Sequence, residues 1–104
     1  MTDSNSVHIV GQVLRDANPT SSRSGNAVYF CLKVPSAFRR DELVYVDCVA
    51  FQDTFDQFEA YLERGETVEV EGSLQFRKFY DEQGNNRRSL EVVARRVSVL
   101  EDEE

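Results

Sequence analysis

The stretch that decides the fold spans residues 65–100 and reads GETVEVEGSLQFRKFY (65–80), DEQGNN (81–86) and RRSLEVVARRVSVL (87–100). Apolar residues of its first arm alternate with polar ones: Val68, Val70, Leu74 and Phe76. A period of two is typical of a half-buried strand. The middle segment has the composition of a tight turn, in which Gly84 can adopt a positive φ angle. Because the second arm is again rich in β-branched residues, the stretch predicts one long β-hairpin.

Cations and aromatic rings are concentrated at the predicted tip of this hairpin: Arg77, Lys78, Phe79, Tyr80, Arg87 and Arg88. Two interpretations are open. The tip is a solvated loop whose rings fold back onto the sheet, since single exposed aromatic residues are common, or it is a site for unpaired nucleic acid. In the second case, phosphates pair with Arg and Lys while bases stack on the rings.

Length and composition restrict the class of protein. A chain of 104 residues with 40% apolar and 30% charged residues is expected to form one domain with a modest core. We assign this domain to residues 1–100 and expect the acidic residues 101–104 to be disordered. The chain shows neither a membrane-spanning apolar run nor a signal peptide, so a cytoplasmic location is expected. Cys31 and Cys48 are then expected to be free thiols.

The net charge of −7 argues against a general nucleic-acid binder. Its distribution weakens that objection, because much of the acid lies at the C-terminus and between residues 53 and 66. The cations elsewhere occur in pairs near aromatic residues: Arg39 with Arg40, Arg77 with Lys78, and Arg87 with Arg88. A ligand responds to the local field more than to the net charge.

The first predicted strand, residues 7–14, is apolar on both faces. The face that begins with Val7 and ends with Val13 is assigned to the core. On the other face we expect His8, Val10 and Leu14 to contact another subunit. The chain is therefore expected to form a homo-oligomer, either a tetramer built of dimers or a dimer.

Two more strands are predicted over residues 28–34 and 44–51, separated by a short basic loop that carries Phe38, Arg39 and Arg40. Residues 16–26 are expected to be a loop because they are rich in Asn, Pro, Ser and Gly. In the second strand the alternation assigns Val28, Phe30, Leu32 and Val34 to the core, and in the third it assigns Val44, Val46, Cys48 and Ala50 to the core. It assigns Tyr45, Asp47, Val49 and Phe51 to the outward face.

One helix is predicted over residues 54–64, between the third and fourth strands, with Gly65 as its left-handed C-cap. Its apolar stripe, which includes Leu62, is assigned to the core. On the last strand the apolar phase changes, which predicts a β-bulge near Ala94 and Arg95. The order of elements predicts an all-β protein: a five-stranded Greek-key barrel of the oligonucleotide/oligosaccharide-binding (OB) type with one helix and a long final hairpin.

With its elements in this order, the chain resembles the bacterial single-stranded DNA-binding protein family from about residue 7 to residue 100. The motifs that carry the resemblance are VHIVGQV (7–13), GNAVYFCLKV (25–34), VDCVAF (46–51), YLERGETVEVEGSL (61–74), YDEQGNNR (80–87) and LEVVA (90–94). The resemblance implies a homotetrameric barrel that wraps single-stranded DNA on aromatic residues, here Phe38, Tyr45, Phe51 and Phe79. The alternation had separately placed the last three away from the core.

Two departures from the family stand out. The family usually has tryptophan at several base-stacking positions, and this chain has none, so weaker binding per base is expected. The family also usually carries a Gly/Pro-rich tail that ends in an acidic-Pro-Phe tip and recruits partners. This chain shows no such tail, so it resembles a short form.

No catalytic residue, metal, cofactor, small-molecule substrate or membrane contact is expected. His8 is the only histidine, and no Ser/His/Asp or Cys/His set can be assembled around it. Cys31 and Cys48 lack the spacing of metal ligands.

Two functional hypotheses remain. The first is sequence-tolerant binding of single-stranded DNA in replication, recombination or repair, favoured by the placed aromatic residues. The second is a protein-interaction module of a primosome-like assembly with weak or no DNA binding, favoured by the acidic balance. We adopt the first. Its predicted contacts are Phe38, Arg39, Arg40, Tyr45, Phe51, Arg77, Lys78, Phe79, Tyr80, Arg87 and Arg88.

Overall fold

The computed structural model describes residues 3–22, 25–39, 41–51 and 62–100. These residues form strands and no helix: β1 (Val7–Val13), β2 (Pro19–Ser22), β3 (Gly25–Pro35), β4 (Leu43–Phe51), β5 (Thr67–Tyr80) and β6 (Asn86–Leu100). Arg40 and the acidic residues 101–104 lie outside the described residues. The described residues therefore contain no helix that could span a membrane.

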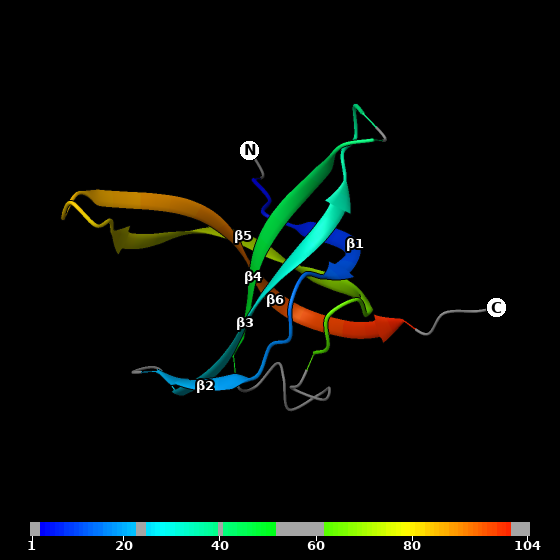
Figure 1. Cartoon of the computed structure of the whole chain (residues 1–104), viewed down its shortest axis with the longest axis horizontal. Helices are drawn as coiled ribbons and strands as arrows, with labels where there is room; N and C mark the ends of the chain where they lie inside the picture. Colours follow the sequence, from blue (N-terminus) through cyan, green and yellow to red (C-terminus); the bar gives the residue numbers. More distant parts are fainter. Residues whose placement is uncertain (1–2, 23–24, 40, 52–61, 101–104) are drawn as a thin grey trace.

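All the strands except β2 close into a ring (Figure 1). The sheet order is β1-β5-β6-β4-β3-β2, and β1 also pairs with β3, so the hydrogen bonding returns to the first strand. The pairings are antiparallel except for the parallel pair of β4 and β6. This is the five-stranded Greek-key barrel that the order of elements predicted. Short β2 pairs only with β3 and lies outside the ring.

One face of each ring strand fills the barrel. The side chains with no exposed surface include Val13, Val28, Leu32, Val68 and Val70. Each belongs to the phase that the alternation had assigned to the core. Full burial of such a side chain stabilises the fold by roughly 1.5–3 kcal/mol.

The long hairpin contains the bulge that the sequence predicts near Ala94 and Arg95. Gly72 pairs with Ala94, and the next pair of the ladder skips Arg95. The skipped residue reverses the phase of β6. Ala94 and Val97 are therefore both buried, although they lie an odd number of residues apart.

The prediction of a loop over residues 16–26 was wrong in part, because β2 lies within it. Its ladder sets Pro19 opposite Val28 and Thr20 opposite Ala27. The Thr20 Oγ1 hydroxyl also donates to the Ala27 carbonyl at 3.3 Å. Proline and serine indicated a loop, but an edge strand tolerates proline because only one of its edges is hydrogen-bonded to a neighbour.

The predicted helix over residues 54–64 lies outside the described residues except for its last three positions, and there it is not borne out. The Leu62 amide donates to the Ala17 carbonyl at 3.0 Å, and the Ala17 amide donates to the Leu62 carbonyl at 2.8 Å. Both backbone groups of Leu62 therefore belong to a β-bridge. The Leu62 side chain is fully buried, as predicted, and Gly65 has a left-handed φ of 90°.

The prediction that Leu74 and Phe76 belong to a half-buried face was wrong. They are 42% and 57% exposed. Figure 1 shows why: the β5–β6 hairpin projects away from the barrel, so none of the other described strands covers its outer half. Val44, at the outer end of β4, is exposed although its phase assigned it to the core.

Val49 is the opposite case, an outward residue that is fully buried. It lies opposite Tyr29 on β3 and beside Val93 on β6. Its neighbours on both sides are thus large enough to cover it. Cys31 and Cys48 are free thiols, as predicted.

Gly72→Ala is expected to lower the free energy of unfolding by about 3 kcal/mol or more, because an added β-carbon would overlap the Val93 carbonyl across the ladder. Gly84→Ala is the matched control. Its added β-carbon has nothing within 4 Å, so it should cost only the left-handed conformation, about 1–2 kcal/mol. Urea denaturation measures both. Equal losses in the two variants would contradict the tight crossing at the bulge.

Candidate nucleic-acid interface

The outward sides of β3, β4 and the β5–β6 hairpin form one continuous surface. On β3 and β4 the register sets Lys33 opposite Tyr45 and Tyr29 opposite Val49. The surface continues onto the hairpin because β4 runs beside β6. We call it the outer face, and define it by Tyr29, Lys33, Tyr45, Arg77 and Phe79.

A contact between Arg77 and Tyr29 ties the hairpin to β3. The Arg77 guanidinium carbon lies 5.8 Å from the centre of the Tyr29 ring, within the range of a cation–π interaction. Tyr29 remains 46% exposed. We did not include Tyr29 among the predicted contacts, although it shares its phase on β3 with Cys31 and Lys33. The pairing of Tyr29 with Val49 on β4 shows that Tyr29 lies on the same face as Tyr45, and the sequence alone does not give this pairing.

The predicted stacking residues on this face are accessible to different degrees. Tyr45 is 60% exposed and Phe79 is 42% exposed, while Phe51 at the end of β4 is only half-buried. Lys33, a second residue that we had not predicted, lies opposite Tyr45 and supplies a cation beside that ring. Rings and cations therefore alternate across the face.

Arg87 pairs with Phe79 and shares its side of the hairpin, whereas Lys78, Tyr80 and Arg88 lie on the other side. Lys78 pairs with Arg88, and Tyr80 pairs with Asn86. The Arg88 guanidinium carbon lies 4.9 Å from the centre of the Phe76 ring. A hollow of about 480 Å³ at the tip is lined by five residues: Lys78, Tyr80, Asn86, Arg87 and Arg88. The hairpin thus presents cations on both of its sides.

Asp81 organises the hairpin turn and restrains one of its cations. Its carboxylate accepts hydrogen bonds from the amides of Gln83 at 3.0 Å and Asn85 at 2.9 Å. It also accepts from the Arg87 Nε at 2.8 Å. The bond from Arg87, followed by the bond from the Asn85 amide, lowers the pKa of Asp81 below its ordinary value. The charge of Arg87 is therefore partly neutralised before any ligand arrives.

The basic loop between β3 and β4 lies far from the hairpin tip (Figure 1). Phe38 is 97% exposed. Its amide and that of Arg39 donate to the Ser36 Oγ at 3.2 and 3.3 Å. Arg39 also forms an exposed ion pair with Glu42 at 3.4 Å. The outer face lies between this loop and the hairpin tip, so a nucleic-acid strand that contacts both would cross it.

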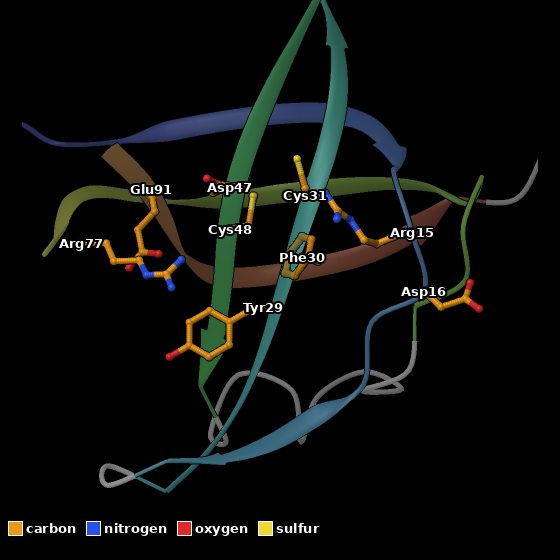
Figure 2. Close-up of a pocket in the computed structure, with 9 residues that line it drawn as sticks. All are labelled: Arg15, Asp16, Tyr29, Phe30, Cys31, Asp47, Cys48, Arg77 and Glu91. Atoms are coloured by element: carbon orange, nitrogen blue, oxygen red, sulfur yellow. The ribbon is translucent and has the colours of Figure 1, made fainter. Parts of the chain in front are cut away.

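A pocket of about 200 Å³ opens at the root of the hairpin (Figure 2). Its lining is Arg15, Asp16, Tyr29, Phe30, Cys31, Asp47, Cys48, Arg77 and Glu91. Burial raises the pKa of Cys48 to about 12. Burial, and then the charge of Asp47, also raises the pKa of Cys31. Both thiols therefore stay protonated at neutral pH, which makes them poor nucleophiles and poor metal ligands. Among the described residues, no group of three His, Cys, Asp or Glu could hold a metal ion.

Of the residues predicted at a subunit contact, His8 and Val10 lie on the outward side of β1, and Leu14 directly follows the strand. The His8 Nε2 is 2.6 Å from Glu69 Oε2. Val10 is 40% exposed, and Leu14 is half-buried. Beside Val10 lies a shallow depression of about 350 Å³ that includes Pro35 and Leu43.

Comparison with known sequences places this geometry in context. A model of the Single-strand binding protein family matches residues 4–100. A single-stranded DNA-binding protein of Onion yellows phytoplasma (strain OY-M) is 28% identical over 102 residues, which cover 94% of this chain and 95% of that protein. Two other bacterial relatives are longer, and the chain spans 61% and 64% of their lengths.

Solved structures with the same fold include two that match nearly the whole chain. The dimeric N-terminal domain of PriB protein from Thermoanaerobacter tencongensis is 25% identical, with a TM-score of 0.68 and coverage of 94% of this chain and 98% of that one. A Plasmodium falciparum SSB complex with ssDNA is 21% identical, with a TM-score of 0.77 and coverage of 97% and 98%. At that identity, the second likeness concerns the fold.

The turn should respond to acid through Asp81. Because the folded-state pKa of Asp81 lies below its unfolded value, its carboxylate stabilises the turn above the unfolded pKa. This contribution is lost as the pH falls through the folded pKa. The NMR shift of the Asn85 amide proton should therefore titrate with a midpoint below the usual range of aspartate. Asp81→Asn should abolish this titration, and Glu82→Gln should leave it in place. A midpoint at or above the usual range would contradict the proposed hydrogen bonds.

Proposed function

We propose that this chain, which belongs to the Single-strand binding protein family, binds single-stranded DNA with little sequence preference along its outer face. The observation that carries the proposal is the alternation of accessible rings and cations there. Tyr29, Tyr45 and Phe79 are between 42% and 60% exposed. Lys33 and Arg77 lie beside two of these rings.

Each type of side chain has a separate task in this proposal. Every base has a π-face, so stacking on a ring binds any base and is worth about 1–3 kcal/mol. Lys33, Arg77 and the tip cations Lys78 and Arg88 would neutralise phosphates. In OB barrels the second and third strands and the last hairpin are the parts that bind oligonucleotides. Here those parts are β3, β4 and the β5–β6 hairpin.

The basic loop extends the proposed path beyond the barrel. Phe38, which is 97% exposed, would stack a base there, with Arg39 and Arg40 on the adjacent phosphates. Phe51, Tyr80 and Arg87 complete the proposed contact set. The restrained Arg87 is expected to contribute least, because Asp81 already pairs with it.

The proposed setting follows from the family. We place the protein in the bacterial cytoplasm, associated with the nucleoid, in replication, recombination or repair. Its role there is to hold unpaired DNA without chemistry of its own, and we assign it no enzymatic activity.

The protein-interaction module remains the second candidate, and the carboxylates on the outer face favour it. Asp16, Asp47 and Glu91 line the pocket among the rings, against two arginines, Arg15 and Arg77. The excess of carboxylates weakens the attraction of a phosphate backbone and suits a basic partner protein. The binding experiment below separates the two candidates.

We also propose that the outward side of β1 joins two copies of the chain. Val10→Glu would set a carboxylate opposite Glu69 on the exposed side of the β1–β5 ladder and should reduce the mass measured by light scattering at micromolar concentration. Thr20→Glu, on the exposed edge strand β2, is the matched control and should leave the mass unchanged. A monomer mass for the unsubstituted protein would refute this contact.

Titrations with oligo-dT at several salt concentrations should distinguish the contribution of base stacking to the affinity from that of phosphate contacts. Phe79→Ala is expected to weaken binding about tenfold, which corresponds to about 1.4 kcal/mol, with little change in the salt dependence. Arg77→Ala should reduce the slope of log K against log salt by about 0.7. If a folded double variant, Phe79→Ala with Tyr45→Ala, keeps full affinity, the stacking proposal fails and the interaction module becomes the better candidate.

A further inference from the structure

Asp47 is out of place on a surface that binds phosphates. It lies near the middle of the outer face, opposite Cys31 on β3. On β4 it lies between Tyr45 and Val49, which point to the same side. Arg15 and Arg77 line the pocket beside Asp47 and can pair with phosphates, whereas the carboxylate itself can only accept a hydrogen bond. A DNA strand that crosses the face is therefore expected to turn the edge of a base toward Asp47.

The pocket beside Asp47 has the shape and lining for a base. Tyr29 forms one wall, and Arg77 reaches over its ring from the hairpin (Figure 2). The Tyr29 and Asp47 positions are diagonal neighbours on one face of the ladder, about 7–8 Å apart. The pocket has a volume of about 200 Å³, well above the roughly 10–15 Å³ that a single water needs.

The other two carboxylates of the pocket are already used. Asp16 Oδ1 accepts a hydrogen bond from the Arg64 amide at 2.8 Å. Glu91, only 5% exposed, accepts from the Gln75 Nε2 at 2.7 Å. Asp47 is exposed, and its neighbour Cys31 offers only a weak thiol donor. It retains the most capacity to accept a hydrogen bond from a ligand.

We infer that this pocket holds one base of the bound strand and that Asp47 selects a base with an exocyclic amino group, cytosine above all. The inference rests on the proposed function, because the base is part of the single strand on the outer face. The cytosine ring would stack against Tyr29 while its N4 amino group donates to the Asp47 carboxylate. Aspartate is a known acceptor for that group. Uracil and thymine present an acceptor oxygen at the same position, which the carboxylate repels. A preference for cytosine is thus superimposed on tolerant binding.

The test compares oligo-dC with oligo-dU of equal length, because their bases differ only at C4 and N3: cytosine has an amino group beside an acceptor nitrogen, and uracil has an oxo group beside an N3–H donor. Both are titrated at mildly alkaline pH, where cytosine stays neutral. Asp47→Asn removes the charge but keeps the size, and its amide can donate to the oxo group. The ratio of the dU to the dC dissociation constant should fall about tenfold in this variant, the loss expected for one base contact of about 1.4 kcal/mol.

Glu82→Gln is the matched control. It makes the same charge change at an exposed position of the hairpin turn, outside the pocket. General electrostatic attraction should strengthen binding of both oligomers in both variants, so it cancels in the ratio. The ratio should therefore stay unchanged in Glu82→Gln.

The outcomes separate this inference from the proposed function. Unchanged ratios in a folded Asp47→Asn protein that still binds both oligomers would overturn the pocket inference alone. Failure of the unsubstituted protein to bind either oligomer would overturn both. A tenfold fall in Asp47→Asn without a fall in Glu82→Gln supports the assignment of Asp47 as the residue that reads the base.

Discussion

Closure of the ring is the constraint on which the rest of the structure depends. β1 has to pair with both β3 and β5, and the closing strand β6 has to reach β4 in parallel. The hairpin meets these demands through one extra residue, Arg95, and a glycine beside it, because the bulge turns β6 while Gly72 lets the two backbones cross closely. β4 still pairs with Val92 and Val93 beyond that crossing, but nearer its tip the hairpin is largely exposed and becomes a projecting arm.

The sequence predicted the parts of the fold that local patterns encode. Alternation identified the core phase of β1, β3 and β5, and a change of phase on β6 was enough to predict the bulge. It misassigned Leu74 and Phe76, because a period of two shows which side a residue faces and not whether anything lies there. It also missed β2, since an edge strand has few apolar residues to mark it.

For the candidate contacts, the sequence predicted which side of a strand a residue faces but not which residues lie next to each other. Phase placed Tyr45 and Phe79 on the outward side, but only cross-strand register shows that Tyr29 and Lys33 share that surface. The restraint of Arg87 by Asp81 likewise depends on how the turn closes. Composition, which counts Arg87 as one cation among the paired runs, carries no information about that ion pair.

The acidic net charge is compatible with a DNA-binding surface because cations accompany the carboxylates of the outer face. Cations occur beside rings and at the hairpin tip, and Arg15 and Arg77 line the pocket at the root of the hairpin together with its three carboxylates. Two of these carboxylates are held by hydrogen bonds within the chain, which reduces their cost to a nearby anion. Among the described residues, Asp47 has only the weak thiol of Cys31 as a side-chain hydrogen-bond partner. Its carboxylate therefore stays available to the edge of a base, while Arg15 and Arg77 remain for the phosphates.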